Sequence, residues 1–264
     1  MPVSGLRTQL SEFVIHEETP VDLILAGHSM ENVFAEIESI LEKSDPEATS
    51  RTLGFLRDAS LYKHPFRDGF QKHLASSTIW DVLQKLLAAP NFWVRKNTIY
   101  TVGKLTHRDR ANLLSEAFPF YFENDPINLP FLLQELVWLT NEWNWSFIQK
   151  TATAKHFLQR WSLCQVLDDG GNQTEIAEQF LEILVQLKAD THRLLAAEAT
   201  FRFERIKIKL GPKLSKPEWR KEVNRISSLE PRITFESAGM QFMRDKTDYT
   251  MAEFDCFVTG LVQG

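Results

Sequence analysis

Cysteine is nearly absent from this sequence of 264 residues, which contains only Cys164 and Cys256. Two distant cysteines without neighbouring ligand residues exclude a disulfide framework and a cysteine-rich zinc site, and they are typical of a reducing compartment. No run of 18 apolar residues occurs, which excludes a membrane-spanning helix. The N-terminus lacks the basic start and apolar stretch of a secretory signal, so we expect a cytoplasmic protein.

Glycine is also scarce, with 11 residues in the chain, and motifs of known sites are absent. Rossmann-like and all-β folds need many tight turns, so this composition disfavours both. The seven histidines show no HExxH or HxH spacing. The Asp-Asp-Gly-Gly sequence at 168–171 lacks the residues of a phosphate loop or a calcium loop, and it predicts a turn. The sequence therefore predicts no catalytic residue, no metal site and no cofactor, and it favours a non-enzymatic protein.

What the chain does contain is a succession of helical segments with short breaks. Ser29 followed by apolar residues at steps of three and four predicts a capped helix, which Asp45-Pro46 ends before a second one begins. In the second helix, four residues are expected to face inward: Leu53, Leu56, Leu61 and Tyr62. Further helices are expected at 79–89, 91–105, 111–122, about 144–167, 174–188, 190–210 and 216–229.

The spacing of these segments predicts paired helices. Pro46, Pro90 and Pro126 are 44 and 36 residues apart, which is the period of two-helix repeats, although three prolines also recur in this way in a helical bundle. In the helix at 190–210, polar strips separate two apolar sides, and one strip comprises Glu198, Arg202, Arg205 and Lys209. A helix that is apolar on two sides is expected between neighbours in a stack.

We therefore expect an all-α fold, an α-solenoid of stacked antiparallel helical hairpins, over residues 1–229. Residues 230–264 show weak helical periodicity and form the irregular C-terminal tail. They are expected to make a short hairpin followed by a helix at 251–262, or a cap on the last repeat.

One segment resembles a known family. The sequence VRKNTIYTVGKL (94–105) is similar to the second helix of a HEAT repeat, with Val94-Arg95, then the small Thr98 and apolar residues at helical spacing. A looser copy is HRLLAAEATFRF (192–203), which contains Arg193. The resemblance to HEAT and armadillo proteins implies an arginine that bonds acidic or carbonyl groups between repeats. It therefore implies a structural role for Arg95, with a ligand contact as the alternative.

Aromatic residues suggest one set of binding residues. Trp143 and Trp145 lie at a helix junction, where indole rings commonly stay partly exposed. Exposed tryptophans serve as anchors for a peptide or a flat ligand. We therefore predict Trp143 and Trp145 as partner-binding residues.

Charge suggests a second set. Residues 1–50 carry a net charge of −8, and residues 191–225 carry +6. Within the basic segment, Arg202, Arg205 and Lys209 line one strip, and they are either partner-binding residues or a solvated edge.

These features predict a scaffold or adaptor that binds another protein or a peptide on the concave face of a solenoid. Nucleic acid is disfavoured because the net charge of the chain is −5. One alternative is a DNA-repair enzyme, because NFWVRKNTI (91–99) resembles the Trp-x-x-Arg helix of HEAT-type alkylpurine DNA glycosylases and Trp80-Asp81 is similar to their Trp-Asp pair. A further alternative is a bilin lyase or related chaperone, from a family that also uses HEAT-like repeats. The sequence sets no oligomeric state.

Overall fold

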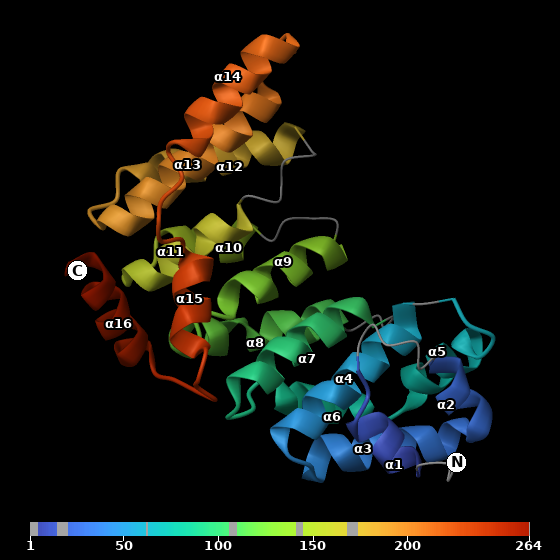
Figure 1. The fold of residues 1–264 in the computed structure, drawn as a ribbon. Coiled ribbons are helices and arrows are strands. Elements are labelled where there is room, and N and C mark those ends of the chain that lie inside the picture. Colours follow the sequence, from blue (N-terminus) through green and yellow to red (C-terminus); the bar gives the residue numbers. More distant parts are fainter. Residues whose placement is uncertain are drawn as a thin grey trace. The chain divides into compact units, whose positions relative to one another are not determined.

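A computed structural model describes residues 5–14, 21–61, 63–105, 110–140, 145–167 and 174–263. These residues form sixteen α-helices and no strand, which confirms the all-α fold class (Figure 1). None of the described helices is long and apolar enough to cross a membrane. The chain divides into two compact units, 1–120 with 135–142 and 121–134 with 143–264. Residues 230–264 fall within the second unit, and the expected domain division at residue 229 stays a prediction.

Helices α1 to α7 belong to the first unit, and the sequence predicted the beginnings of two of them, α3 from Ser29 and α4 from Asp45-Pro46. Their bounds are α1 Leu6–Ser11, α2 Val21–Gly27, α3 Met30–Lys43, α4 Pro46–Leu61, α5 Arg67–Ser76, α6 Ile79–Leu86 and α7 Phe92–Lys104. The Ser29 hydroxyl accepts the Asn32 amide before α3, and the Asp45 carboxylate accepts two backbone amides at the start of α4. Such caps satisfy N–H groups that have no partner within the helix.

Three phenylalanines from successive helices form the centre of the first unit. The Phe34 ring of α3 lies 5.0 Å from the Phe70 ring of α5, which in turn lies 6.3 Å from Phe55 of α4. All three side chains are buried, and Phe34 lies on the apolar face that the sequence predicted for α3, whereas α5 was not predicted from the sequence. Among the described residues of α4 that were expected to face inward, Leu61 is the exception. It is 46% exposed at the end of α4, so the expectation that it faces inward is wrong. Tyr62 lies outside the described residues.

Helix α7 allows the close approach of a buried carboxylate from α9. Helices α8 (Arg110–Asn124) and α9 (Leu129–Thr140) have residues in both units, and Glu135 of α9 belongs to the first. Glu135 is 4% exposed, and its Oε2 lies 3.1 Å from Lys104 Nζ. Burial raises the pKa of Glu135, and Lys104 opposes that shift. A Cβ on residue 103 would lie 2.8 Å from Glu135 Cγ and closer still to the carboxylate, so only Gly103 leaves room.

We expect Gly103→Ala to lower the free energy of unfolding by about 1–2 kcal/mol, because the buried Glu135 side chain must shift. Urea unfolding followed by circular dichroism measures the change. Gly69→Ala is the matched control, because a Cβ on Gly69 in α5 meets nothing within 4 Å and alanine favours a helix over glycine. Equal stability of the two variants would contradict the need for a glycine at position 103.

Arg95 of α7 holds the turn that leads into its own helix. The Asn91 side chain caps α7 by accepting the amides of Trp93 and Val94. Arg95 is 3% exposed, and its Nη1 donates to the carbonyls of the two residues that precede Asn91, at 2.8 and 3.0 Å. Charged donors to otherwise open carbonyls make strong hydrogen bonds. Arg95 therefore has a structural role, while the bond between repeats that the HEAT resemblance implied stays a prediction.

The second unit contains helices α10 to α16, whose bounds are α10 Trp145–Ala152, α11 Phe157–Val166, α12 Thr174–Lys188, α13 Arg193–Leu210, α14 Lys216–Ser227, α15 Phe235–Met243 and α16 Met251–Gln263. The expected single helix over 144–167 is wrong, because α10 and α11 are separate helices (Figure 1). The break follows from His156, whose Nδ1 accepts the Leu158 amide and begins α11. The expected turn at 168–171 lies outside the described residues.

Arg160 of α11 repeats the arrangement of Arg95. It stands four residues after the cap His156, as Arg95 stands four residues after its own cap, and its Nη1 donates to the carbonyls of the two residues before His156 at 2.6 and 2.9 Å. Its Nε also donates to Asp190 Oδ2 at 2.6 Å, in the turn between α12 and α13. Arg160 therefore makes the same kind of contact as Arg95, whereas Arg193, expected in that role, is exposed.

Helix α13 carries an ion pair in the centre of its buried face. Leu195, Ala199 and Ile206 are fully buried, but Glu198 and Arg202 are buried as well, with exposed fractions of 0% and 8%. At 100° per residue, Glu198 and Arg202 lie between these apolar residues and Phe201, which is also buried. The two residues therefore separate two apolar sides as expected, but this part of the polar strip is buried rather than solvated.

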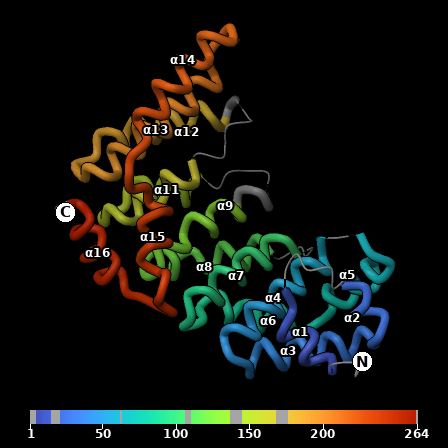
Figure 2. The backbone as a smooth tube through the Cα atoms, viewed as in Figure 1, coloured from blue at the N-terminus to red at the C-terminus, as the bar shows by residue number. Residues whose placement is uncertain are grey.

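Most of the described tail after residue 230 is helical (Figure 2). The expected short hairpin is therefore wrong. Helix α16 confirms the helix expected at 251–262. The Thr234 hydroxyl accepts the Ser237 amide, and the Ser237 hydroxyl accepts the Thr234 amide, which begins α15. The tail is also tied to the rest of the second unit. The Tyr249 hydroxyl donates to Asp125 at 2.9 Å and accepts the Ile127 amide at 3.0 Å.

Candidate functional site

Of the two predicted tryptophan anchors, one can be placed. Trp143 lies outside the described residues. Trp145 is the first residue of α10 and is half-buried, and its ring meets the Phe180 ring of α12 edge to face at 5.9 Å. The ring therefore has a packing role within the second unit, and its use as an anchor for a partner stays a prediction.

Arg202, predicted as a partner-binding residue, is engaged inside the protein. Its Nη2 lies 3.1 Å from Glu198 Oε1. The other oxygen of Glu198 accepts the Trp161 indole N–H at 2.8 Å and the Phe235 amide at 2.7 Å, which links α11, α13 and α15. Burial raises the pKa of Glu198, while Arg202 and the hydrogen bonds of this cluster oppose the shift. Arg202 is thus not part of a solvated edge.

Arg205 and Lys209 lie further along α13, where the helix leaves the core. Arg205 is half-buried and lies over the Phe201 ring at 5.5 Å, while Lys209 is exposed. They begin a basic run, because residues 205–221 contain seven basic side chains and one acidic side chain. All of these basic side chains except Arg205 are exposed: Lys207, Lys209, Lys213, Lys216, Arg220 and Lys221. The sequence therefore located a basic surface, which extends from α13 into α14.

Helix α14 exposes apolar side chains beside this charge. Ile226 is its only buried residue, and α14 packs mainly against α13 (Figure 1). Trp219 and Val223 are 44% and 38% exposed. These three residues are spaced by four and then three positions, so they share one face of the helix. We refer to Lys216, Trp219, Arg220 and Val223 as the α14 surface.

One ion pair holds α14 against α13 near its C-terminal end, and a second lies within α14. Arg225 lies 2.7 Å from Glu204 of α13 and 2.7 Å from Glu222 of its own helix. At the N-terminal end, the Glu218 carboxylate accepts the Ser215 amide at 2.9 Å and begins the helix. These contacts fix the orientation of α14, so that Trp219 and Val223 remain exposed although Ile226 is buried.

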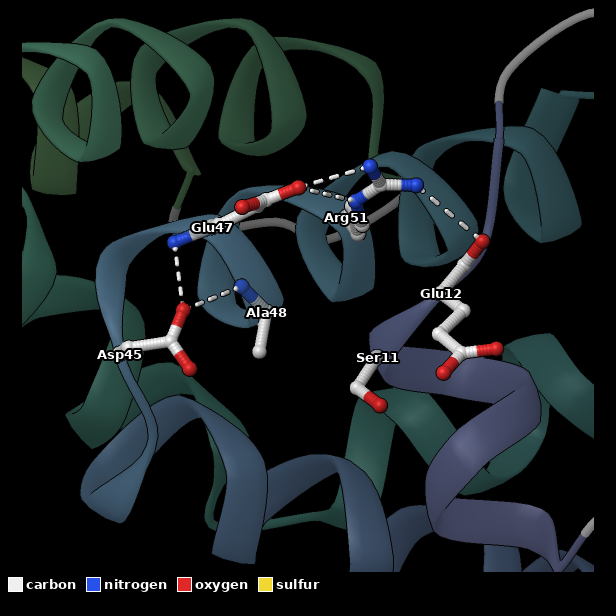
Figure 3. Close-up of a pocket in the computed structure, with 6 residues that line it drawn as sticks. All are labelled: Ser11, Glu12, Asp45, Glu47, Ala48 and Arg51. Carbon is white, nitrogen blue, oxygen red and sulfur yellow. Dashed lines mark hydrogen bonds and ion pairs between the residues drawn. The ribbon is translucent and has the colours of Figure 1, made fainter.

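A separate groove of about 520 Å³ lies between the end of α1 and the start of α4 in the first unit (Figure 3). Its polar groups bond to one another. Asp45 accepts the backbone amides of Glu47 and Ala48, and these bonds lower the pKa of Asp45. Arg51 donates to the Glu47 carboxylate and to the Glu12 carbonyl. The groove therefore shows helix capping and a surface ion pair rather than charges that await a ligand.

Trp219 and Val223 were not predicted as binding residues, because 216–229 was interpreted only as one more helix. The signal was available in EWRKEVNRI (218–226), where the apolar residues stand at spacings of four and three among charged ones. Among the residues that the structure describes, no group of three or more histidine, cysteine, aspartate or glutamate side chains is arranged to hold a metal ion. Comparisons with known proteins found no matching family model, no matching curated protein and no matching solved structure.

Proposed function

We propose that this protein is a non-enzymatic interaction scaffold that binds another protein through the α14 surface. The observation that carries the proposal is the exposure of Trp219 and Val223 on a helix that packs against the fold along one side. Beside them lie basic side chains that have no ion-pair partner among the described residues. Exposure of a tryptophan side chain to water is unfavourable in the isolated protein. Burial of the same side chain under a partner is favourable and contributes to the free energy of binding. Tryptophan and arginine are the residue types that contribute most to binding at protein interfaces.

We further propose that the helices form HEAT-like hairpins stacked as in an α-solenoid. The equivalent positions of Arg95 and Arg160 support this arrangement, because each follows a helix cap by four residues and bonds the carbonyls of the preceding turn. The bond from Arg160 to Asp190 joins α11 to the turn of the following helix pair, as stacking of neighbouring repeats requires.

A pull-down from cells of the native host, with proteins identified by mass spectrometry, tests the scaffold proposal. We expect partners of the full-length protein to be lost with Trp219→Ala/Val223→Ala, because the variant removes the exposed apolar area. Val185→Ala is the matched control, since Val185 of α12 is 55% exposed but lies outside the α14 surface. Partners that Trp219→Ala/Val223→Ala retains, but that Trp145→Ala loses, would instead place binding at the predicted aromatic anchor.

A further inference from the structure

The charges of α14 are arranged in rows along the helix. Lys216 and Arg220 are four residues apart and form a basic row, and Trp219 and Val223 form an apolar row. At 100° per residue, the two rows lie about 60° apart around the helix axis. Glu218 and Glu222 form an acidic row, which lies about 100° from the apolar row on the flank away from the basic row. The exposed apolar row is therefore bordered by positive charge on one flank and negative charge on the other.

The two flanks differ in how far their charges are satisfied within the protein. Glu222 pairs with Arg225, and Glu218 accepts hydrogen bonds at the start of the helix. Lys216 and Arg220 are exposed, and neither has an ion-pair partner among the described residues. A partner that covers the apolar row can therefore gain from the basic flank by bringing carboxylates to it.

We infer that the α14 surface binds an acidic amphipathic helix of a partner protein, which lies along the apolar row and places its carboxylates beside Lys216 and Arg220. This inference rests on the scaffold proposal and adds the class of partner. A helix fits because its apolar residues repeat at the three- and four-residue spacing of Trp219 and Val223. Carboxylates on one flank of that helix meet the basic row, while the flank that meets the acidic row is neutral or basic.

The same rows disfavour a nucleic acid. A phosphate backbone gains from Lys216 and Arg220 but gains nothing from the acidic row on the other flank, whose carboxylates already have partners within the protein. The indole of Trp219 offers a base a stacking surface, but the isopropyl group of Val223 does not. Only a partner with apolar side chains on one face uses both exposed residues.

The experiment measures fluorescence anisotropy of a labelled synthetic helix of about 18 residues, which is about five helical turns. The peptide carries leucine at helical spacing on one face and glutamate along one flank, and a second peptide replaces each glutamate by lysine. We expect the full-length protein to bind the acidic peptide at least about tenfold more tightly than the basic one. Lys216→Glu/Arg220→Glu is expected to reverse that preference, and Trp219→Ala/Val223→Ala to weaken binding of the acidic peptide by about tenfold or more.

Lys155→Glu/Arg244→Glu is the matched charge reversal, because both residues are exposed in the second unit but lie outside α14. Circular dichroism of every variant checks that it is folded. Equal binding of both peptides, or no effect of Lys216→Glu/Arg220→Glu, overturns the inference. So does tighter binding of a labelled single-stranded oligonucleotide, or a concentration-dependent dimer in sedimentation that Lys216→Glu/Arg220→Glu abolishes. If the pull-down partners still depend on Trp219 and Val223 in such a case, the scaffold proposal stands and only the partner class is wrong.

Discussion

Glu198→Ala is expected to lower the free energy of unfolding of the second unit by about 3–5 kcal/mol, the largest effect among the substitutions considered. Glu198 is fully buried and accepts from Arg202, Trp161 and the Phe235 amide. Removal of the carboxylate leaves the charge of Arg202 buried without this counter-ion and two N–H donors without an acceptor. Urea unfolding of the full-length chain, followed by tryptophan fluorescence, measures the loss.

The matched control is Glu182→Ala, because Glu182 of α12 is exposed and its removal should change the free energy of unfolding by less than about 0.5 kcal/mol. Glu198→Ala combined with Arg202→Met removes both charges and is expected to recover part of the stability, since no unpaired buried charge remains. A loss below about 1 kcal/mol for Glu198→Ala alone would mean that the cluster does not hold α11, α13 and α15 together.

Helix starts were the most predictable part of the fold, because they depend on local chemistry. Ser29 and Asp45 accept backbone amides where their sequence context indicated. The break between α10 and α11 was not predictable in the same way. Residues 153–156 contain neither glycine nor proline, and the cap is the ring nitrogen of His156, which is an uncommon cap.

The structure of the tail after residue 230 was likewise not predictable from local sequence. Its β-branched and aromatic residues suggested weak helix formation, yet Thr234 and Ser237 cap each other and the buried Phe235 packs edge to face on Trp161, with ring centres 5.4 Å apart. Tertiary packing therefore outweighs local propensity there.

The candidate site was predicted in its charge but not in its shape. The basic segment at 191–225 is visible in the sequence, but a helical projection cannot tell which polar residues of an amphipathic helix face solvent. Arg202 and Lys209 are both basic residues of the same strip, yet Arg202 is buried against Glu198 and Lys209 is exposed. The difference depends on α11 and α15, which cover one end of the strip, and no local pattern specifies that contact.

Arg95→Met and Arg160→Met are each expected to lower the free energy of unfolding by about 2–3 kcal/mol, because each leaves two backbone carbonyls without a charged donor. Methionine keeps much of the apolar stem, so the loss reports mainly the hydrogen bonds. Arg193→Met is the matched control, because Arg193 is exposed at the start of α13 and should have little effect. The part of the loss that comes from the carbonyls should be similar for the two arginines, and Arg160→Met should lose the ion pair to Asp190 in addition.

The free energies of unfolding of the two variants should nevertheless respond differently to acidic pH. Burial by itself raises the pKa of Asp190, but the hydrogen bonds from Arg160 and the His192 amide, with the charge of Arg160, hold it below its usual value. A lowered carboxylate pKa gives stability that is present above the pKa of the unfolded chain, about 3.9, and is lost as the pH falls through the folded value. Arg160→Met should therefore be less sensitive than the unmodified protein to a fall in pH below about 4, whereas Arg95→Met should keep the full acid sensitivity. Urea unfolding at a series of pH values separates the two, and equal acid sensitivity of both variants would contradict a role for Asp190 in joining α11 to the turn before α13.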